Sequence, residues 1–220
     1  MNPIGIPATH WPPLPPDPPE PQRPPSPWLP EARPPAPASA TASLVIGAPD
    51  WLAQRLLDQR VVALSGELDD DAANRAVAQL GLLDASGDAP VSLRLSGVSA
   101  DLGVALTLVD ALDLMGAPVH AVCLGTLSGP AVALLAVADR RLAGRHATLH
   151  LCEPRWPHGL PGRDLETVAA EQARQLRRLQ ERMAEACRRP AEEIAADMGA
   201  GKLLTADEAR DYGLVDRTEP

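Results

Sequence analysis

The sequence contains no phenylalanine, one tyrosine and a single lysine, Lys202. The scarcity of aromatic side chains removes most of the surfaces on which single-stranded nucleic acid stacks. The net charge is −9 and no basic cluster stands outside one predicted helix, so neither nucleic acid nor an anionic membrane is expected as a partner. No apolar run reaches the length of a membrane span, and the longest, residues 131–138, suits a buried helix.

Cysteine is also scarce. Cys123, Cys152 and Cys187 are too few and too scattered for a disulfide framework, and none belongs to a Cys-x-x-Cys pair. No spacing of His, Cys, Asp or Glu suggests a metal site, so no metal and no cofactor is expected. The N-terminus shows no basic region followed by an apolar one, which predicts a cytoplasmic protein without a secretory signal.

Proline, in contrast, is concentrated at one end of the chain. Sixteen of the 25 prolines precede residue 38, and we predict that residues 1–42 form a disordered Pro-rich arm. Proline lacks a backbone N–H and holds φ near −65°, so this arm should sample extended conformations without packing. The alternative is a docking arm, because proline-rich segments interrupted by Trp11 and Trp28 can bind aromatic grooves.

From about Leu44 onward, apolar runs alternate between the periods of strands and helices, and residues 43–220 are predicted to form one α/β domain. The predicted strands are 61–64, 91–95, 119–124 and 147–152, and the predicted helices are 69–83, 103–115, 131–137 and 164–187. The glycines Gly66 and Gly97 are expected to end the first two strands, and residues 125–130 to form a turn. Residues 155–163 are predicted to be a loop. This order implies parallel strands joined by helical crossovers.

Two further segments are informative. The helix predicted over residues 164–187 is the longest in the chain and carries one strongly charged face. It exceeds what a domain of this size needs to cover its own sheet, which suggests a role in assembly. Near the C-terminus, Thr205 and Glu208 fit a capping box, and Gly213 supplies the left-handed stop of the same helix.

These segments, in this order, resemble the ClpP proteolytic subunit of Clp proteases over residues 44–217. The most specific stretch is residues 203–216, LLTADEARDYGLVD. Weaker similarities cover residues 61–71, 121–125, 133–136, 139–143 and 152–154. The resemblance implies a crotonase-like ββα spiral with the long helix as a handle. It also implies a ring, commonly of seven subunits, that stacks on a second ring through the handles and works with an AAA+ unfoldase.

The catalytic triad of the family is not retained. When its serine, histidine and aspartate are carried onto this sequence, they fall on Gly129, Cys152 and Gly201. A serine protease requires a nucleophile, a base and a group that orients the base. None of the three positions holds the residue that the family uses.

The oxyanion hole of the family is affected as well. One of its donors is the N–H of the residue after the serine, and Pro130 stands there without an N–H. The other donor comes from a glycine pair whose positions fall on Ser99 and Ala100, with Gly97 nearby.

Ser128 and Cys152 are the candidate displaced nucleophiles. Ser128 precedes a Gly-Pro pair, which favours a helix N-cap over a nucleophile, and a shift of one residue turns a helical side chain by about 100°. His150 shares a strand face with Cys152, but cysteines in strands are usually small buried residues, whereas a catalytic thiol requires a partly exposed, electropositive setting. His146 and His158 fall in predicted loops.

The sequence therefore favours a ClpP-like homologue without catalytic activity. It would act as a structural or regulatory subunit of a Clp-type ring, as a homo- or hetero-oligomer. The first alternative is an active ATP-dependent Clp serine peptidase that uses Ser128. The second is a crotonase-type acyl-CoA enzyme, in which an oxyanion hole acts on a thioester and no serine is needed; acyl-CoA binding measured by calorimetry would support it.

Overall fold

The computed structural model describes residues 50–154 and 165–219. The chain divides into two units, Met1–Thr41 and Ala42–Pro220, and every described residue belongs to the second. The Pro-rich arm predicted over residues 1–42, with Trp11 and Trp28, lies outside the described residues. The predicted loop over residues 155–163, with His158, lies outside them too.

Helices and strands alternate through most of the described chain. The helices are α1 (Asp50–Asp58), α2 (Asp70–Ala85), α3 (Leu102–Asp113), α4 (Val132–Ala136), α5 (Leu165–Cys187), α6 (Ala191–Ala200) and α7 (Ala206–Tyr212), with the short 3₁₀ helix η1 (Gly129–Ala131). The strands are β1 (Val61–Leu68), β2 (Val91–Ala100), β3 (Val119–Ser128), β4 (Arg140–Gly144), β5 (Thr148–Leu151), β6 (Lys202–Thr205) and β7 (Arg217–Glu219). The predicted α/β class is confirmed.

In the described part of the chain, seven strands form one sheet. The order β1-β2-β3-β4-β7 is parallel throughout. β3 pairs with β4 through residues 120–123 and with β5 through residues 126–128. β4 and β5 therefore pair with successive segments along the same edge of β3. β6 is antiparallel to β5. The parallel pairing predicted from the sequence is confirmed for β1, β2, β3 and β5, whereas β4 was not predicted.

Three neighbouring strands continue past the glycines at which the sequence predicted an end or a turn. Gly66, Gly97 and Gly125 have φ of +76°, +61° and +71°, and the pairing register shifts beside Gly66 and across Gly97. A left-handed glycine accommodates the extra residue of a β-bulge, so the strand bends and pairing resumes. The predicted strand ends at Gly66 and Gly97 were therefore wrong, as was the predicted turn over residues 125–130.

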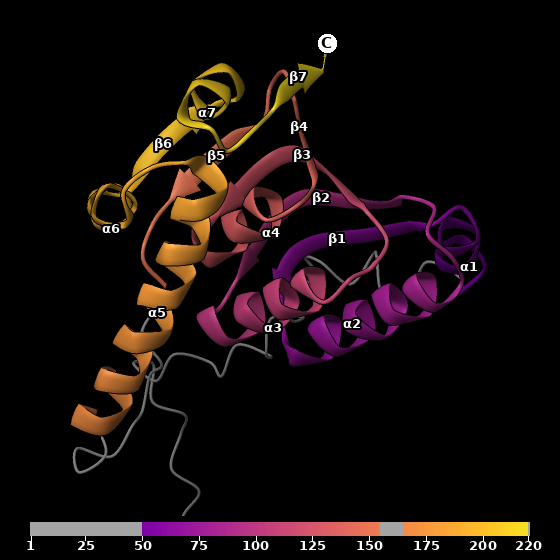
Figure 1. The fold of residues 1–220 in the computed structure, drawn as a ribbon, viewed down its shortest axis with the longest axis horizontal. Helices are drawn as coiled ribbons and strands as arrows, with labels where there is room; N and C mark the ends of the chain where they lie inside the picture. The colour runs from indigo at the N-terminus through magenta and orange to yellow at the C-terminus, as the bar shows by residue number, and fades with distance from the viewer. Residues whose placement is uncertain (1–49, 155–164, 220) are drawn as a thin grey trace, which may run out of the picture. The chain divides into compact units, whose positions relative to one another are not determined.

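Because the strands continue, their last residues lie at one edge of the sheet. β1 runs to Leu68, β2 to Ala100 and β3 to Ser128. Each strand end is followed closely by a helix, which packs back along the sheet. Figure 1 shows α2 and α3 side by side along β1 to β3, with α4 beside them and α5 next to α4.

The core is aliphatic, as the composition predicts. Every residue of α4 is buried, and the largest fully buried side chains come from the central strands and the helices that cover them. Leu93, Leu127 and Leu149 represent three neighbouring strands in this core. The helix predicted over residues 131–137 is divided into η1 and α4, because Pro130 stands in the first turn and removes a backbone donor.

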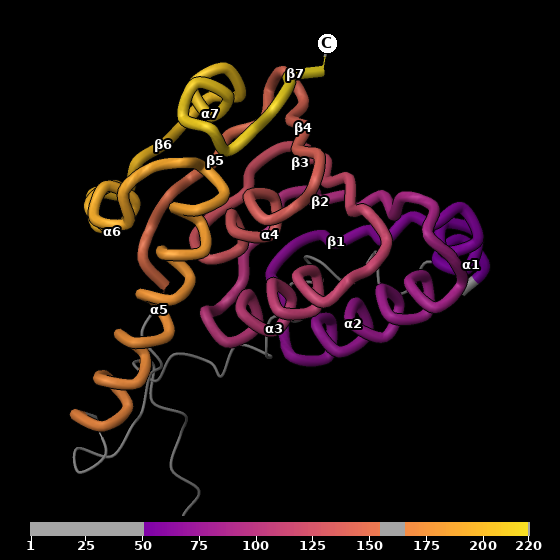
Figure 2. The backbone as a smooth tube through the Cα atoms, viewed as in Figure 1, coloured from indigo at the N-terminus to yellow at the C-terminus, as the bar shows by residue number. Residues whose placement is uncertain are grey.

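The long helix α5 has 23 residues and two different halves. Its buried side chains all lie in the C-terminal half: Leu179, Gln180, Met183, Ala184 and Cys187. No residue from 166 to 178 is buried. The smooth backbone trace shows the N-terminal turns extending away from the sheet (Figure 2). The predicted long helix is confirmed.

The C-terminal segment is anchored to the sheet by Arg141. Its guanidinium donates to Asp216 and to the carbonyl oxygens of Ala186 and Gly213, and the Arg141 N–H donates to Asp216 at 2.8 Å. The predicted capping box of α7 and its left-handed glycine stop are both present. Local sequence rules thus located the last helix at residue level.

Candidate functional site

A row of four polar side chains crosses the sheet just beyond the bulges. Glu67 pairs in register with Ser99, Ser99 with Ser128, and Ser128 with His150. Residues paired in register on neighbouring strands point to the same face of a sheet. All four line one cavity of about 280 Å³. The row therefore places a carboxylate, two hydroxyls and an imidazole in one concave site.

The predicted serine and histidine positions of the family face each other in this cavity. A Cβ built on Gly129 would lie 3.6 Å from Sγ of Cys152 and 3.8 Å from its carbonyl oxygen. Gly129 has φ of +63°, a left-handed conformation that glycine adopts without strain. The two positions thus retain the proximity that a nucleophile and its base would need, without the side chains.

The third triad position lies on the far side of His150. Gly201 is the left-handed C-cap of α6 (φ 67°, ψ 47°), and its N–H bonds back to Asp197 and Met198. A Cβ there would lie 3.6 Å from Nε2 of His150. Gly201 does not line the cavity. The position predicted for the aspartate is therefore adjacent to His150, and the residue present acts as a helix stop.

The oxyanion positions are brought together only in part. Ser99 and Ala100 end β2 and line the cavity with Pro130. Gly97 does not line it and instead forms the bulge of β2. The pair predicted for the second donor, Ser99 and Ala100, therefore lies beside the site. Pro130 lies in η1 and has no N–H to direct into the cavity.

Ser128 occupies the N-cap position of η1, with φ of −134° and ψ of 148°, as predicted. Its side chain makes no capping hydrogen bond, and this part of the prediction was wrong. A capping hydroxyl bonds the N–H of the second or third helical residue, and the second residue here is Pro130. The Ser128 side chain lines the cavity instead.

His150 lines the cavity together with Cys152, with which the sequence placed it on one face. The sequence analysis did not anticipate that the strand register also makes His150 the direct neighbour of Ser128. The predicted turn over residues 125–130 concealed this pairing. No hydrogen bond joins Ser128 to His150 in the part of the chain that the structure describes. The pair is adjacent but is not assembled as a hydrogen-bonded dyad.

Two further acidic residues were missed by the sequence analysis. Asp101 and Glu153 line the same cavity as Glu67. Asp101 follows the end of β2, and Glu153 follows β5 by two residues. Only the observation that neighbouring parallel strands end at the same edge would have indicated them.

The three cysteines lie in different environments. Burial raises the pKa of Cys123 to about 11 and that of Cys187 to about 11. Cys152 is half-buried and lines the cavity, so the expectation of a small buried strand residue does not hold for it. His146 is exposed in the turn between β4 and β5, as predicted.

Within residues 50–154 and 165–219, no three His, Cys, Asp or Glu side chains form a group that would hold a metal ion. The helices in the same ranges include none with the length and hydropathy of a membrane span.

The arrangement defines an α/β protein with a helix-covered, mainly parallel sheet and a polar cavity where adjacent strands end. A profile of the Clp protease family matches residues 49–219, and the chain belongs to this family. The predicted family resemblance is thereby confirmed.

Curated relatives agree with this assignment. The chain is 33% identical over 171 residues to the ATP-dependent Clp protease proteolytic subunit 3 of Rhodococcus jostii, covering 76% of this chain and 85% of the relative. It is 30% identical over 168 residues to subunit 1 of Corynebacterium glutamicum, covering 74% and 80%. It is 29% identical over 168 residues to subunit 2 of Corynebacterium jeikeium, with the same coverage of 74% and 80%.

Proposed function

We propose that this chain is a non-catalytic subunit of a Clp-type ring assembly, with a structural or regulatory role beside active subunits. The observation that carries the proposal is the pair Gly129 and Cys152, which face each other in the cavity and are the positions onto which the sequence carries the family serine and histidine. Glycine has no side chain to act as a nucleophile. A thiol in place of imidazole removes the base that accepts the serine proton.

The oxyanion chemistry points the same way. Pro130 follows Gly129 and has no N–H, so one donor to a tetrahedral intermediate is missing. Loss of a single oxyanion donor typically lowers kcat by about 10²–10³, or about 2.7–4 kcal/mol. This loss is independent of the missing serine and histidine, so a single substitution would not restore activity.

An assembly role is supported by α5. A helix of 23 residues with its buried side chains confined to the second half leaves the first half available to other subunits. Members of the Clp protease family form oligomeric rings. Here the partners would be further copies of this chain or active ClpP-type subunits. An AAA+ unfoldase and a cytoplasmic location belong to the same proposal, because such a motor works where ATP is available.

An active peptidase that uses Ser128 is the second candidate. It is favoured by the register between Ser128 and His150 and by their shared cavity. In this reaction the Ser128 hydroxyl would attack the scissile carbonyl while His150 takes its proton and later gives it to the leaving amine. The N–H of Gly129 would act as the oxyanion donor. The missing hydrogen bond between the two side chains weighs against this candidate.

Labelling with a fluorophosphonate or β-lactone probe, followed by intact-mass analysis, separates the two candidates. The chain is treated alone and together with an active ClpP-family subunit that serves as a positive control. We expect an adduct on the active subunit and none on this chain. An adduct on this chain that disappears in Ser128→Ala but persists in Ser96→Ala would establish the second candidate instead. Ser96 is exposed and lies outside the cavity, so it is the matched control.

Assembly is measured separately by light scattering. We expect a mass well above that of one chain, either for this protein alone or after mixing with an active ClpP-type subunit. A monomeric mass in both samples at micromolar concentration would contradict the ring proposal, whatever the labelling result.

A further inference from the structure

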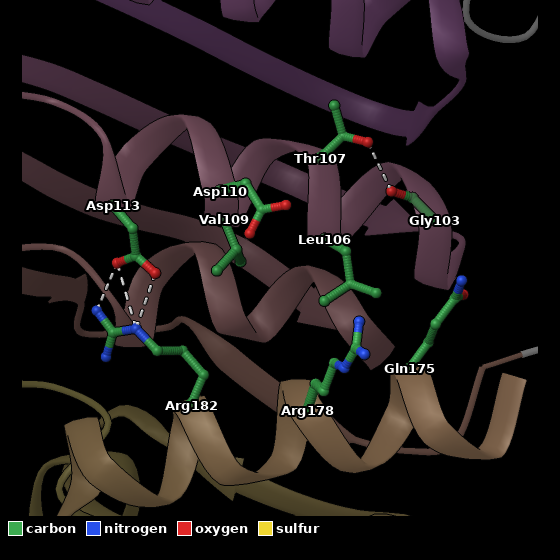
Figure 3. A pocket seen from close by; sticks show the side chains of 9 residues that line it. All are labelled: Gly103, Leu106, Thr107, Val109, Asp110, Asp113, Gln175, Arg178 and Arg182. Carbon is green, nitrogen blue, oxygen red and sulfur yellow. Dashed lines mark hydrogen bonds and ion pairs between the residues drawn. The ribbon is translucent and has the colours of Figure 1, made fainter. Parts of the chain in front are cut away.

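A second cleft lies between α3 and α5, separate from the cavity at the strand ends. Its volume is about 460 Å³, and residues of both helices line it (Figure 3). At one end Arg182 of α5 clamps Asp113 of α3, with Nε at 3.0 and 3.2 Å from the two carboxylate oxygens and Nη2 at 2.6 Å from Oδ1. This bidentate pair holds the two helices together and closes the cleft at that end.

Two opposite charges in the cleft make no hydrogen bond or ion pair within the described chain, although the pKa of Glu171, lowered mainly by Arg174, is also lowered by the charge of Arg178. Arg178 on α5 and Asp110 on α3 both line the cleft and are exposed. Neither side chain makes a hydrogen bond or an ion pair with any residue that the structure describes. The nearby pair of Arg182 and Asp113 is already satisfied, so Arg178 and Asp110 are the charges available to a ligand.

The lining between these charges is partly apolar, with Leu106 and Val109 beside the polar Thr107 and Gln175. Val109 is buried and Leu106 is half-buried, and both belong to the cleft lining. Figure 3 shows Leu106 and Val109 projecting from α3 toward α5, with the Arg178 side chain reaching from α5 toward α3. The cleft therefore combines a cation on one wall, an anion on the other and a partly aliphatic surface between them.

We propose that this cleft binds short peptides with free termini. The peptide carboxylate would bind the planar guanidinium of Arg178, which suits bidentate recognition. The terminal ammonium would bind Asp110, and an apolar side chain would contact Leu106 and Val109. A volume of about 460 Å³ lies within the range of small-ligand sites.

The dimensions favour a short peptide over an element of another subunit. A helix with its side chains is about 10–12 Å across and rises about 5.4 Å per turn, so a single turn already occupies about as much space as this cleft of about 460 Å³. A helix of a second copy therefore covers such a cleft without entering it. Hydrolysis of a peptide bond is the class of reaction that supplies the ligand. The inference is independent of whether this chain itself catalyses that reaction.

The test is a titration of the full chain with four forms of one dipeptide, in which binding is detected by saturation-transfer NMR. The forms of Leu-Ala are the free peptide, the N-acetylated peptide, the C-amidated peptide and the doubly blocked peptide. We expect the free dipeptide to bind and each single block to weaken binding about tenfold, since each removes one charge-assisted hydrogen-bonding group. Absence of binding by the free form, or equal binding of all four forms, overturns the proposal.

Variants assign each terminus to its partner. In Arg178→Gln, amidation of the peptide should no longer weaken binding, whereas acetylation should still weaken it. In Asp110→Asn, acetylation should no longer weaken binding, whereas amidation should still weaken it. Arg177→Gln and Asp71→Asn are controls, because both residues are exposed and outside the cleft. If Arg178→Gln alters the oligomeric mass while the free dipeptide fails to bind, a second copy occupies this surface and the proposal is wrong. Dipeptide binding is measured in the same way whether or not the chain is catalytically active. Its outcome is therefore distinguishable from the outcome of the labelling experiment.

Discussion

Stepwise restoration of the family site tests the account of lost catalysis. Gly129→Ser, Cys152→His and Gly201→Asp would place the three family side chains at their matching positions. There is room for the first and the last, because a Cβ at residue 129 or 201 has no neighbour nearer than 3.6 Å. The backbone opposes both, since φ is +63° at Gly129 and +67° at Gly201. A left-handed conformation costs about 1–2 kcal/mol for a residue with a side chain.

The triple variant should therefore be less stable and still nearly unreactive. Two strained residues cost about 2–4 kcal/mol in total, and about 2–4 °C per kcal/mol predicts a fall in Tm of about 4–16 °C. Pro130 still lacks an N–H. Adding Pro130→Ala supplies that donor, and we expect the rate of fluorophosphonate labelling to rise by about 10²–10³ relative to the triple variant.

The assay is the second-order rate constant of labelling, measured by intact mass at neutral pH. The matched control carries the other three substitutions but keeps Gly129, so it has no serine at that position and should stay unlabelled there. Equal rates with alanine and with proline at residue 130 would refute the oxyanion argument. Labelling of the unmodified chain at Ser128 would refute the loss of catalysis itself.

Two further predictions concern stability and thiol reactivity. Arg141→Met should lower the free energy of unfolding by about 2–3 kcal/mol. This value already allows for solvent screening of the ion pair, because the Asp216 side chain is 40% exposed. Burial alone raises the pKa of Asp216, but the hydrogen bonds and charge of Arg141 outweigh it and hold that pKa below its usual range. The contribution is therefore present above the unfolded pKa and lost as the pH falls through the folded one. Urea denaturation at fixed protein concentration should show the difference between wild type and variant shrinking in acid, and a pH-independent difference contradicts this account. At pH 8, iodoacetamide should modify Cys152 well before Cys123 and Cys187, whose thiols have a pKa of about 11; peptide mapping that shows a buried cysteine labelled first would disprove this.

Some features of this protein follow from the sequence because they depend on neighbours along the chain. The capping box of Thr205 and Glu208 and the glycine stop at Gly213 are contacts within one helical turn, so the residue order specifies them. The apolar periodicity of α2, α3 and α5 located those helices to within two residues. The prediction that the family serine and histidine fall on Gly129 and Cys152 likewise depends only on residue identity and order.

The ends of the strands were not available from the sequence. Gly66, Gly97 and Gly125 are equally compatible with a chain reversal and with a bulge, since both use a left-handed glycine. The choice depends on whether the next strand offers backbone partners beyond the glycine. Here all three glycines lie on adjacent strands, so each strand finds its partner and the sheet continues to the cavity.

The make-up of the candidate site was decided by the same pairing. The sequence by itself determined the family and the long helix and predicted that the triad is missing, because these depend on local pattern and residue type. Only the tertiary structure brought Ser128 beside His150 and set Arg178 across a cleft from Asp110. These residues are far apart in sequence, and the register of strands and the packing of helices determine which of them meet.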